Sequence, residues 1–224
     1  MVKLKSPVIV LNFKTYSQAV GEKAVKMAKM CEEVAAQGID IVVAPQIPDI
    51  YRVASRINIP VFSQHVDGAG AGSFTGHITA EALKENGSTG SIINHSERRL
   101  NIADIDEAVQ KAHESGLATI LCTNNVSTTT ACAALGPDFV AIEPPQLIGS
   151  GIPVSKADPK IVTDSVKAVK QISPNVRVLC GAGISKGEDL KAAIELGSEG
   201  VLLASGIIKA KDPRAAMQDL IKLI

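Results

Sequence analysis

The sequence alternates between two kinds of segment from one end to the other, and this alternation limits the fold more than any other feature. Eight short apolar runs, rich in β-branched residues, have the continuous hydrophobicity of strands covered on both faces. They span residues 8–12, 39–44, 60–64, 90–94, 117–122, 139–143, 176–181 and 200–204. Amphipathic segments lie between them at 17–37, 47–57, 79–85, 104–115, 125–135, 158–172, 186–196 and 213–223. The pattern predicts eight successive β/α units.

The ends of the amphipathic segments carry residues that begin and end helices. Asp104, Asp158 and Asp212 stand where the first backbone N–H groups need an acceptor, and prolines follow the last two. Glycines follow the expected last turns at Gly38, Gly87, Gly116, Gly136 and Gly197. Because glycine readily adopts the left-handed conformation that ends many helices, these positions predict separate helices between the strands.

Eight such units can form one closed structure of the α/β class. Parallel strands joined by right-handed crossovers make a sheet covered by helices, and closing that sheet removes both exposed edges. The alternative is an open doubly wound sheet, for which a G-x-G-x-x-G fingerprint is expected after the first strand. Residues 10–15 contain no such fingerprint, and no Pro- or Ser-rich linker interrupts the chain. We therefore expect residues 1–224 to form a single (β/α)8 barrel domain with eight parallel strands and outer helices.

Composition and charge argue against several classes of protein. The 23 basic and 23 acidic side chains give no net charge, whereas nucleic-acid and membrane-surface binders normally carry a basic excess. No apolar run approaches the roughly 20 residues that cross a bilayer. The four cysteines form no C-x-x-C pair, and residues 1–10 are not followed by the small-residue cleavage site of a signal peptide. We expect no nucleic-acid partner, no membrane association and a cytoplasmic protein with reduced thiols.

Ionisable side chains stand where three of the strands are expected to end. In β/α barrels the functional site lies at the carboxyl ends of the strands, and Lys14, His95 and Glu143 follow or end the first, fourth and sixth. Each alone has a plain alternative: a solvated lysine, a structural histidine or a loop-capping glutamate. Together they supply a cation, an electrophile and a base, which suits proton abstraction next to a carbonyl group.

Five segments around these positions closely resemble the signature segments of the triosephosphate isomerase family, in that family's order. They are Asn-Phe-Lys at 12–14, Gly-Ser-Phe-Thr-Gly at 72–76, Asn-His-Ser-Glu-Arg-Arg at 94–99, Ala-Ile-Glu-Pro at 141–144 and Ile-Gly-Ser-Gly at 148–151. The resemblance covers essentially the whole chain, and the segment at 143–149 is most similar to the compact archaeal branch. It implies a TIM barrel that interconverts dihydroxyacetone phosphate and glyceraldehyde 3-phosphate, a small phosphorylated sugar, through an enediol-type intermediate.

The resemblance also implies a role for each catalytic residue. Glu143 matches the base that carries a proton between adjacent carbons, and His95 matches the neutral electrophile that polarises the carbonyl. In triosephosphate isomerases a helix N-terminus keeps this imidazole neutral, and a helical turn at 96–98 would place His95 similarly. Lys14 and Asn12 match the cation and the hydrogen-bond donor beside the developing negative charge. Glu97 matches the residue that orients the lysine; its alternative is a surface ion pair with a neighbouring arginine.

Three glycine-containing turns are the expected binding elements for the phosphate group. Glycine lets backbone N–H groups approach a phosphate closely, and barrels often bind phosphate after strands seven and eight. The predicted contacts are Ile148, Gly149, Gly183, Ala204 and Ser205. Residues 144–153, with prolines at both ends, are expected to form a lid that excludes water from the intermediate.

This chain departs from the family pattern at three places in these turns. Pro145 and Gln146 replace a valine and a tryptophan, Gly183 replaces a serine, and Ala204 with Ser205 replaces a glycine pair. All three lie in the lid or in the phosphate-binding turns, and none replaces an ionisable residue. We therefore expect them to change phosphate affinity and lid motion more than the proton-transfer chemistry.

Thr75 matches the tip of a loop that enters the neighbouring subunit in the family. A homo-oligomer is therefore implied, either a dimer or a tetramer, with the tetramer favoured by the resemblance to archaeal members; an ordinary turn is the alternative for Thr75. No metal or cofactor is expected, because the four histidines lack ligand-like spacing and the chemistry requires neither. Two other functions remain: a phosphoribosyl-sugar isomerase barrel, and a barrel that has lost catalysis and serves as a binding protein.

Overall fold

The computed structural model describes residues 2–148 and 151–224. Eight parallel strands form one sheet. They are β1 (Val8–Asn12), β2 (Asp40–Ala44), β3 (Phe62–Ser63), β4 (Gly90–Ile93), β5 (Ala118–Thr123), β6 (Phe139–Ile142), β7 (Arg177–Gly181) and β8 (Gly200–Leu203). Their order, β2-β1-β8-β7-β6-β5-β4-β3, brings strands from both ends of the chain together. An isolated bridge between Val43 of β2 and Val61, just before β3, brings the two ends of this order together, so the sheet is a nearly closed barrel, as predicted.

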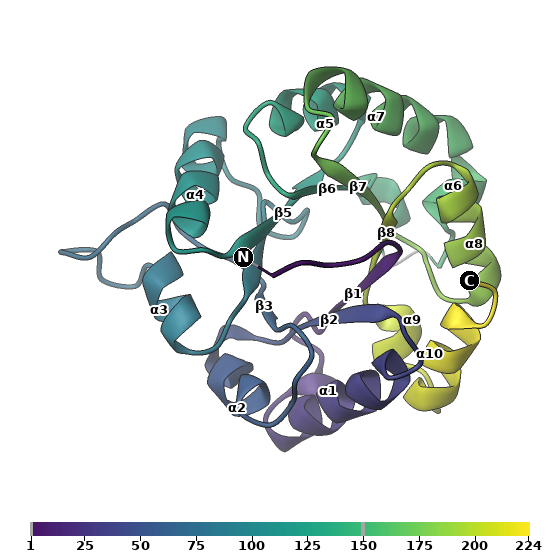
Figure 1. The fold of residues 1–224 in the computed structure, drawn as a ribbon, viewed down its shortest axis with the longest axis horizontal. Helices are drawn as coiled ribbons and strands as arrows, with labels where there is room; N and C mark the ends of the chain where they lie inside the picture. Colours follow the sequence, from purple (N-terminus) through teal and green to yellow (C-terminus); the bar gives the residue numbers. More distant parts are fainter. Residues whose placement is uncertain (1, 149–150) are drawn as a thin grey trace.

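Helices surround the barrel as a ring, which is visible when it is viewed along its axis (Figure 1). The α-helices are α1 (Glu22–Ala35), α2 (Ile50–Ala54), α3 (Ala80–Glu85), α4 (Ile102–Glu114), α5 (Val126–Ala133), α6 (Val154–Ala157), α7 (Pro159–Ile172), α8 (Gly187–Glu195), α9 (Ser205–Ile208) and α10 (Pro213–Ile221). Short 3₁₀ turns occur at η1 (Ser17–Ala19), η2 (Ile47–Asp49) and η3 (Pro145–Leu147). All five glycines predicted to end helices have positive φ angles.

Three predicted elements differ from the observed ones for local reasons. The segment at 17–37 is not one helix, because Gly21, at φ 60°, separates η1 from α1. Helix α4 begins two residues before the predicted start: Asn101 is its N-cap and accepts from the N–H of Asp104, so the prediction that Asp104 caps it is wrong. Strand β3 contains two residues, because Pro60 has no N–H for the ladder and contributes its carbonyl alone, to the N–H of Val43.

The apolar core has two layers that follow from the alternation of side chains along each strand. One set of strand residues fills the barrel interior: Val8, Val10, Val42, Ala44, Phe62, Ile92, Ala118, Ile120, Cys122, Phe139, Ala141, Leu179 and Leu202. The other set, which includes Ile9, Leu11 and Val43, packs outward against the helices. Side chains of the described residues therefore fill the interior, so a ligand on the barrel axis is expected at an end of the strands.

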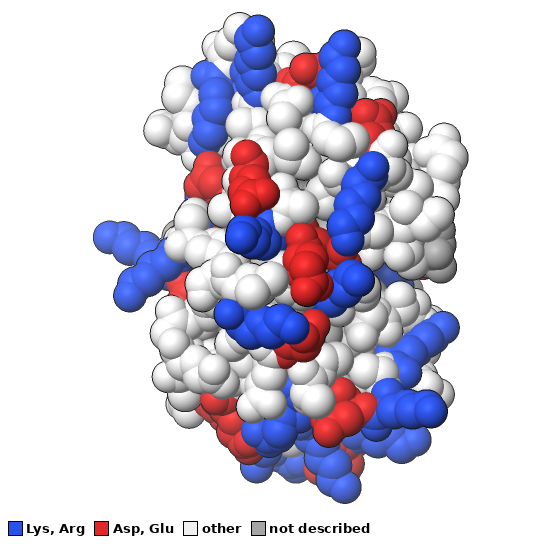
Figure 2. All heavy atoms as spheres, turned by 90° about the vertical axis from the view of Figure 1, so that its right-hand side faces the viewer, with Lys and Arg blue, Asp and Glu red and all other residues white. Residues whose placement is uncertain are grey.

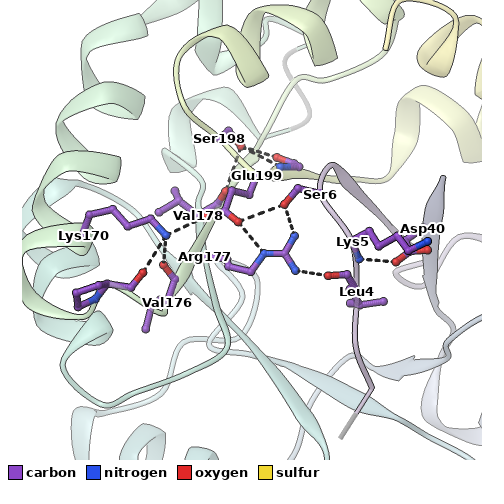
Figure 3. A network of polar contacts seen from close by, with 12 residues as sticks. Leu4, Lys5, Ser6, Asp40, Lys170, Val176, Arg177, Val178, Ser198 and Glu199 are labelled. Carbon is purple, nitrogen blue, oxygen red and sulfur yellow. Dashed lines mark hydrogen bonds and ion pairs between the residues drawn. The ribbon is translucent and has the colours of Figure 1, made fainter.

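The amino end of the barrel is closed by a polar network centred on Arg177 (Figure 3). Arg177 donates to the backbone oxygen of Leu4, to Ser6 Oγ and to Glu199 Oε2, at 2.8, 2.6 and 2.9 Å. Lys170 Nζ reaches the other oxygen of Glu199 at 2.9 Å. The network fixes the segment before β1 across this end, which leaves the carboxyl end as the open one.

The outer surface carries no large region of a single charge in the view over α8 and α10. There, Lys and Arg side chains alternate with Asp and Glu (Figure 2). Among the residues that the structure describes, no helix has the length and apolar character needed to cross a bilayer.

Candidate active site

A cavity of about 90 Å³ opens at the carboxyl ends of the strands. Four predicted residues line it: Asn12 at the end of β1, Lys14 just after that strand, His95 after β4 and Glu143 after β6. The structure thus brings together four side chains from three distant parts of the sequence. The turns after β7 and β8 complete the wall, through residues 182–185 and 202–206.

The loop after β1 holds Lys14 in a conformation that few non-glycine residues adopt. Its φ angle is 46°, and Asn12 Oδ1 accepts from the N–H of Lys14 at 2.9 Å. Gln64 supports the same loop by donating to the backbone oxygens of Lys14 and Ala44. The Lys14 ammonium lies 2.8 Å from Glu97 Oε1, so the residues predicted to pair are in contact. Asn12 also lines the cavity.

His95 is buried, and both of its ring nitrogens have polar neighbours. Asn94, at φ 59°, turns the chain out of β4, and the N–H of Arg98 donates to the His95 oxygen at 2.7 Å. The predicted helical turn at 96–98 is thus a single hydrogen-bonded turn. The N–H of Glu97 donates to His95 Nδ1 at 3.2 Å. Nδ1 therefore accepts a hydrogen bond and also lies 3.4 Å from Glu97 Oε2, while Nε2 lies 3.6 Å from Glu143 Oε2 in the cavity.

Glu143 is 4% exposed, and its Oε2 has no hydrogen-bond partner among the described residues. That oxygen lies 3.6 Å from His95 Nε2. Burial alone would raise the pKa of Glu143, but contact with His95, the Cys122 thiol and the Lys14 ammonium outweighs it, so the pKa lies below its ordinary value. Gly181 makes room for this side chain, since a Cβ there would lie 2.3 Å from Glu143 Cγ. Glu143 is therefore an ionised carboxylate in the cavity wall, with one oxygen to which no described residue hydrogen-bonds.

The turns after β7 and β8 form another part of the cavity wall. Ala182 and Gly183 have φ angles of 68° and 73°, and a Cβ on Gly183 would lie 1.9 Å from the backbone oxygen of Ile152. After β8, Ala204 and Ser205 lead into α9, whose first N–H groups have no acceptor within the helix. Residues with positive φ concentrate at this mouth, as is usual for functional sites.

The other predicted site residues are distributed as follows. Ile148, Gly183, Ala204 and Ser205 line the cavity, whereas Gly149 lies outside the described residues. Glu97 lines a neighbouring cavity of about 310 Å³ on the far side of Lys14. Thr75 is exposed in the connection between β3 and α3, which projects away from the barrel (Figure 1).

Several residues that line the cavity are not among the predicted site residues, and two of them, Tyr16 and Ser185, have polar side chains. Tyr16 comes from the loop after β1 and Ser185 from the turn after β7. Ser185 stands two residues beyond a predicted phosphate contact, so extending that turn would have included it. Within the described ranges, no group of three or more His, Cys, Asp or Glu side chains is arranged to hold a metal ion.

Comparisons with known proteins agree with this arrangement. The family model for triosephosphate isomerase matches residues 7–224. Triosephosphate isomerases from Methanosarcina barkeri and Methanocaldococcus jannaschii are 64% and 54% identical, over 97% and 96% of this chain and 99% of each relative. A solved triosephosphate isomerase from Bartonella henselae is 20% identical, with a TM-score of 0.79, and the match covers 97% of this chain and all of that one. The similarity to archaeal methanogen enzymes confirms the resemblance read from the sequence.

Proposed function

The chain belongs to the triosephosphate isomerase family, and we propose that Glu143 and His95 carry out this family's reaction at the mouth of its barrel. The enzyme interconverts dihydroxyacetone phosphate and D-glyceraldehyde 3-phosphate through an enediol intermediate. The observation that supports the assignment most directly is the buried Glu143 carboxylate, whose free Oε2 lies 3.6 Å from His95 Nε2.

Glu143 acts as the proton carrier. Its carboxylate removes a proton from the carbon next to the carbonyl of dihydroxyacetone phosphate and returns it to the neighbouring carbon. The C–H electron pair moves into the C–C bond while the carbonyl oxygen becomes a hydroxyl with a proton from His95, which gives the enediol. The neighbouring hydroxyl then gives a proton back to His95 as its C=O bond forms, and Glu143 returns its proton to the former carbonyl carbon, which gives the aldehyde. A positioned base of this kind contributes about 10²–10⁴-fold. The lowered pKa of Glu143 keeps the base ionised at neutral pH.

His95, Asn12 and Lys14 stabilise the charge that develops on the substrate oxygens. His95 donates from Nε2, which is favoured by the Glu97 N–H on its other nitrogen. Asn12 donates from its amide, and Lys14, held by Glu97, provides a fixed positive charge. Because these groups are already in place, they need little reorganisation as the charge forms.

We assign the phosphate group to the part of the cavity formed by the loops that follow β6, β7 and β8. We assign the contacts to Ile148 and Gly149 in the loop after β6, Gly183 after β7, and Ala204 with Ser205 at the start of α9. The close packing of Gly183 against Ile152 explains why a residue without a side chain stands there. Residues 144–153 form the lid, which shields the enediol intermediate from water.

A homo-oligomer completes the site. Phe74 is 49% exposed at the tip of the projecting connection, next to Thr75. The 310 Å³ cavity beside Lys14 is the place where this tip from a second copy would fit. A tetramer is favoured over a dimer by the similarity to archaeal enzymes, and mass measurement in solution distinguishes the two. Phe74→Asp is expected to yield smaller species with reduced turnover.

We also propose that the protein is cytoplasmic and that its chain forms a single domain. A cytoplasmic location is supported by four cysteines that are buried and unpaired, as in reducing compartments. A single domain over residues 1–224 is supported by the one sheet, which joins β1 to β8.

A coupled assay with glyceraldehyde 3-phosphate tests the proposed residues. Glu143→Gln keeps the shape of the side chain and removes its basicity, so we expect kcat to fall by about 10²–10⁴-fold. Glu195→Gln is the matched control, because its side chain is 67% exposed on the outer surface of α8. If Glu143→Gln and Glu195→Gln turn over equally well, Glu143 is not the base. An inactive wild-type protein would contradict the assigned reaction itself.

A further inference from the structure

Asp189 is a buried carboxylate outside the catalytic set, and one of its oxygens organises the turn after β7. It lies in the first turn of α8 and is 1% exposed. Its Oδ2 accepts from the N–H and the Oγ of Ser185 at 3.1 and 3.2 Å, and from the N–H of Lys186 at 3.3 Å. Since Ser185 lines the active-site cavity, Asp189 holds one wall of that cavity in place.

The other oxygen of Asp189 binds a residue from the end of the lid. Lys156 Nζ donates to Asp189 Oδ1 at 2.7 Å. Lys156 lies in α6 (Val154–Ala157), which follows directly after the lid segment at 144–153. Its side chain is 47% exposed, so the cation itself remains partly hydrated while its partner is buried. One carboxylate therefore bonds both to the phosphate-side turn and to the C-terminal attachment of the lid.

Backbone contacts join the same two segments. The N–H of Val154 donates to the oxygen of Ala182 at 3.4 Å. Gly183 packs so closely that an added Cβ would overlap the backbone of Ile152. The pair of Lys156 and Asp189 is thus the charged part of a continuous contact between the lid attachment and the turn, across 33 positions of sequence.

We propose that Lys156 and Asp189 form a latch that couples the position of the lid to occupancy of the phosphate site. Both are positioning residues, because neither lines the active-site cavity. In this proposal, a phosphate bound at residues 182–185 restrains the turn after β7. The hydrogen bonds of Ser185 to Asp189 Oδ2 then restrain the Asp189 carboxylate. The ion pair of Asp189 Oδ1 with Lys156 in turn restrains α6, to which the lid is attached. The latch rests on the proposed function, since it needs a phosphorylated substrate and a lid.

The competing interpretation is that Asp189, at position N3, only completes the capping box at the start of α8 and that Lys156 only neutralises it. A capping aspartate contributes to stability but has no reason to change substrate binding or the fate of the intermediate. The two interpretations therefore differ in what is measured: a cap affects unfolding, whereas a latch affects phosphate binding and the protection of the enediol intermediate. An intermediate exposed by a loose lid expels inorganic phosphate by breaking its C–O bond.

The main test compares Lys156→Met with Lys160→Met. Methionine keeps the unbranched stem and removes the charge, and Lys160 is an exposed lysine of α7 with no ion pair in the described part of the chain. For Lys156→Met we expect the inhibition constant of inorganic phosphate and KM to rise about fivefold, the lower end of typical coupling between sites. The inorganic phosphate released per turnover is expected to rise as well, with kcat reduced less than kcat/KM. Lys160→Met is expected to match the wild type.

Two further variants separate the charge contact from folding. Lys156→Arg restores a cation and is expected to recover most of the phosphate affinity. Asp189→Asn keeps an oxygen acceptor for the turn but removes the charge, and it is expected to resemble Lys156→Met in phosphate release. The latch is refuted if Lys156→Met lowers only the melting temperature, or if Lys160→Met changes the kinetics equally. Wild-type turnover in the same assay establishes the reaction independently, so a failed latch leaves the proposed function intact.

Discussion

Gly181→Ala tests whether the position of the Glu143 carboxylate, and not its presence alone, determines turnover. A Cβ at residue 181 would lie 2.3 Å from Glu143 Cγ and 2.9 Å from its Oε1. Glu143 Cγ must therefore move by about 1 Å to reach an ordinary contact distance, and misplacement of this size costs about 10²-fold in rate. The contacted atoms belong to a side chain that can rotate, so the strand need not move. We expect kcat to fall by about 10–10²-fold.

The assay measures kcat in both directions together with the melting temperature. A double-mutant cycle with Glu143→Gln gives the decisive comparison, because Gly181→Ala acts through Glu143 in this interpretation. Once the base is absent, adding Gly181→Ala is expected to cost little further turnover. If the two losses are additive, or if Gly181→Ala leaves kcat unchanged while the protein remains folded, the reasoning is wrong.

Three more predictions follow from the structure. Glu199→Gln removes the carboxylate that Arg177 and Lys170 share, and denaturant unfolding at neutral pH is expected to show a loss of about 1 kcal/mol, modest because the group is partly exposed. Those two cations lower the pKa of Glu199 although its partial burial would raise it. The charged carboxylate therefore stabilises the folded protein at neutral pH. The difference in unfolding free energy between wild type and Glu199→Gln should shrink as the pH falls through that lowered pKa. The pKa of Glu143 is also lowered, so the acid limb of the kcat/KM profile is expected below the ordinary glutamate value of about 4.3; a midpoint above that value would contradict the site electrostatics. Gly183→Ala places a Cβ against the backbone of the lid end, and kcat/KM is expected to fall about 10-fold or more; a change of less than twofold would show that the turn adjusts freely.

Local sequence signals predicted most of the fold because burial pattern and helix ends are local properties. The eight apolar runs located the strands to within a few residues, and Asp158 and Asp212 are the observed N-caps. The remaining errors concern the start of one helix and one helix that was too short to detect. Asn101, not Asp104, caps α4, although Asn is as good a cap as Asp. Helix α6 has four residues, too few for a periodic signal, and was not predicted.

The candidate site was predictable to the extent that it lies at strand ends. Lys14, His95 and Glu143 were placed there by the β/α pattern, and they line one cavity. The hydrogen bonding of His95 and the pKa of Glu143 were not predictable from the strand pattern. That His95 Nδ1 accepts from the Glu97 N–H depends on the course of one turn, and the lowered pKa of Glu143 depends on groups from other strands.

The sequence by itself determined the repeating unit, the barrel and the residues that stand at its mouth, because periodicity and caps act over a few residues. The tertiary structure alone decided the contacts between distant segments. Gly181 makes space for Glu143, Lys156 reaches Asp189 across 33 positions, and Arg177 holds Leu4 across 173. Such pairs leave no periodic trace in a single sequence, because each depends on how the strands are ordered when the sheet closes into a barrel.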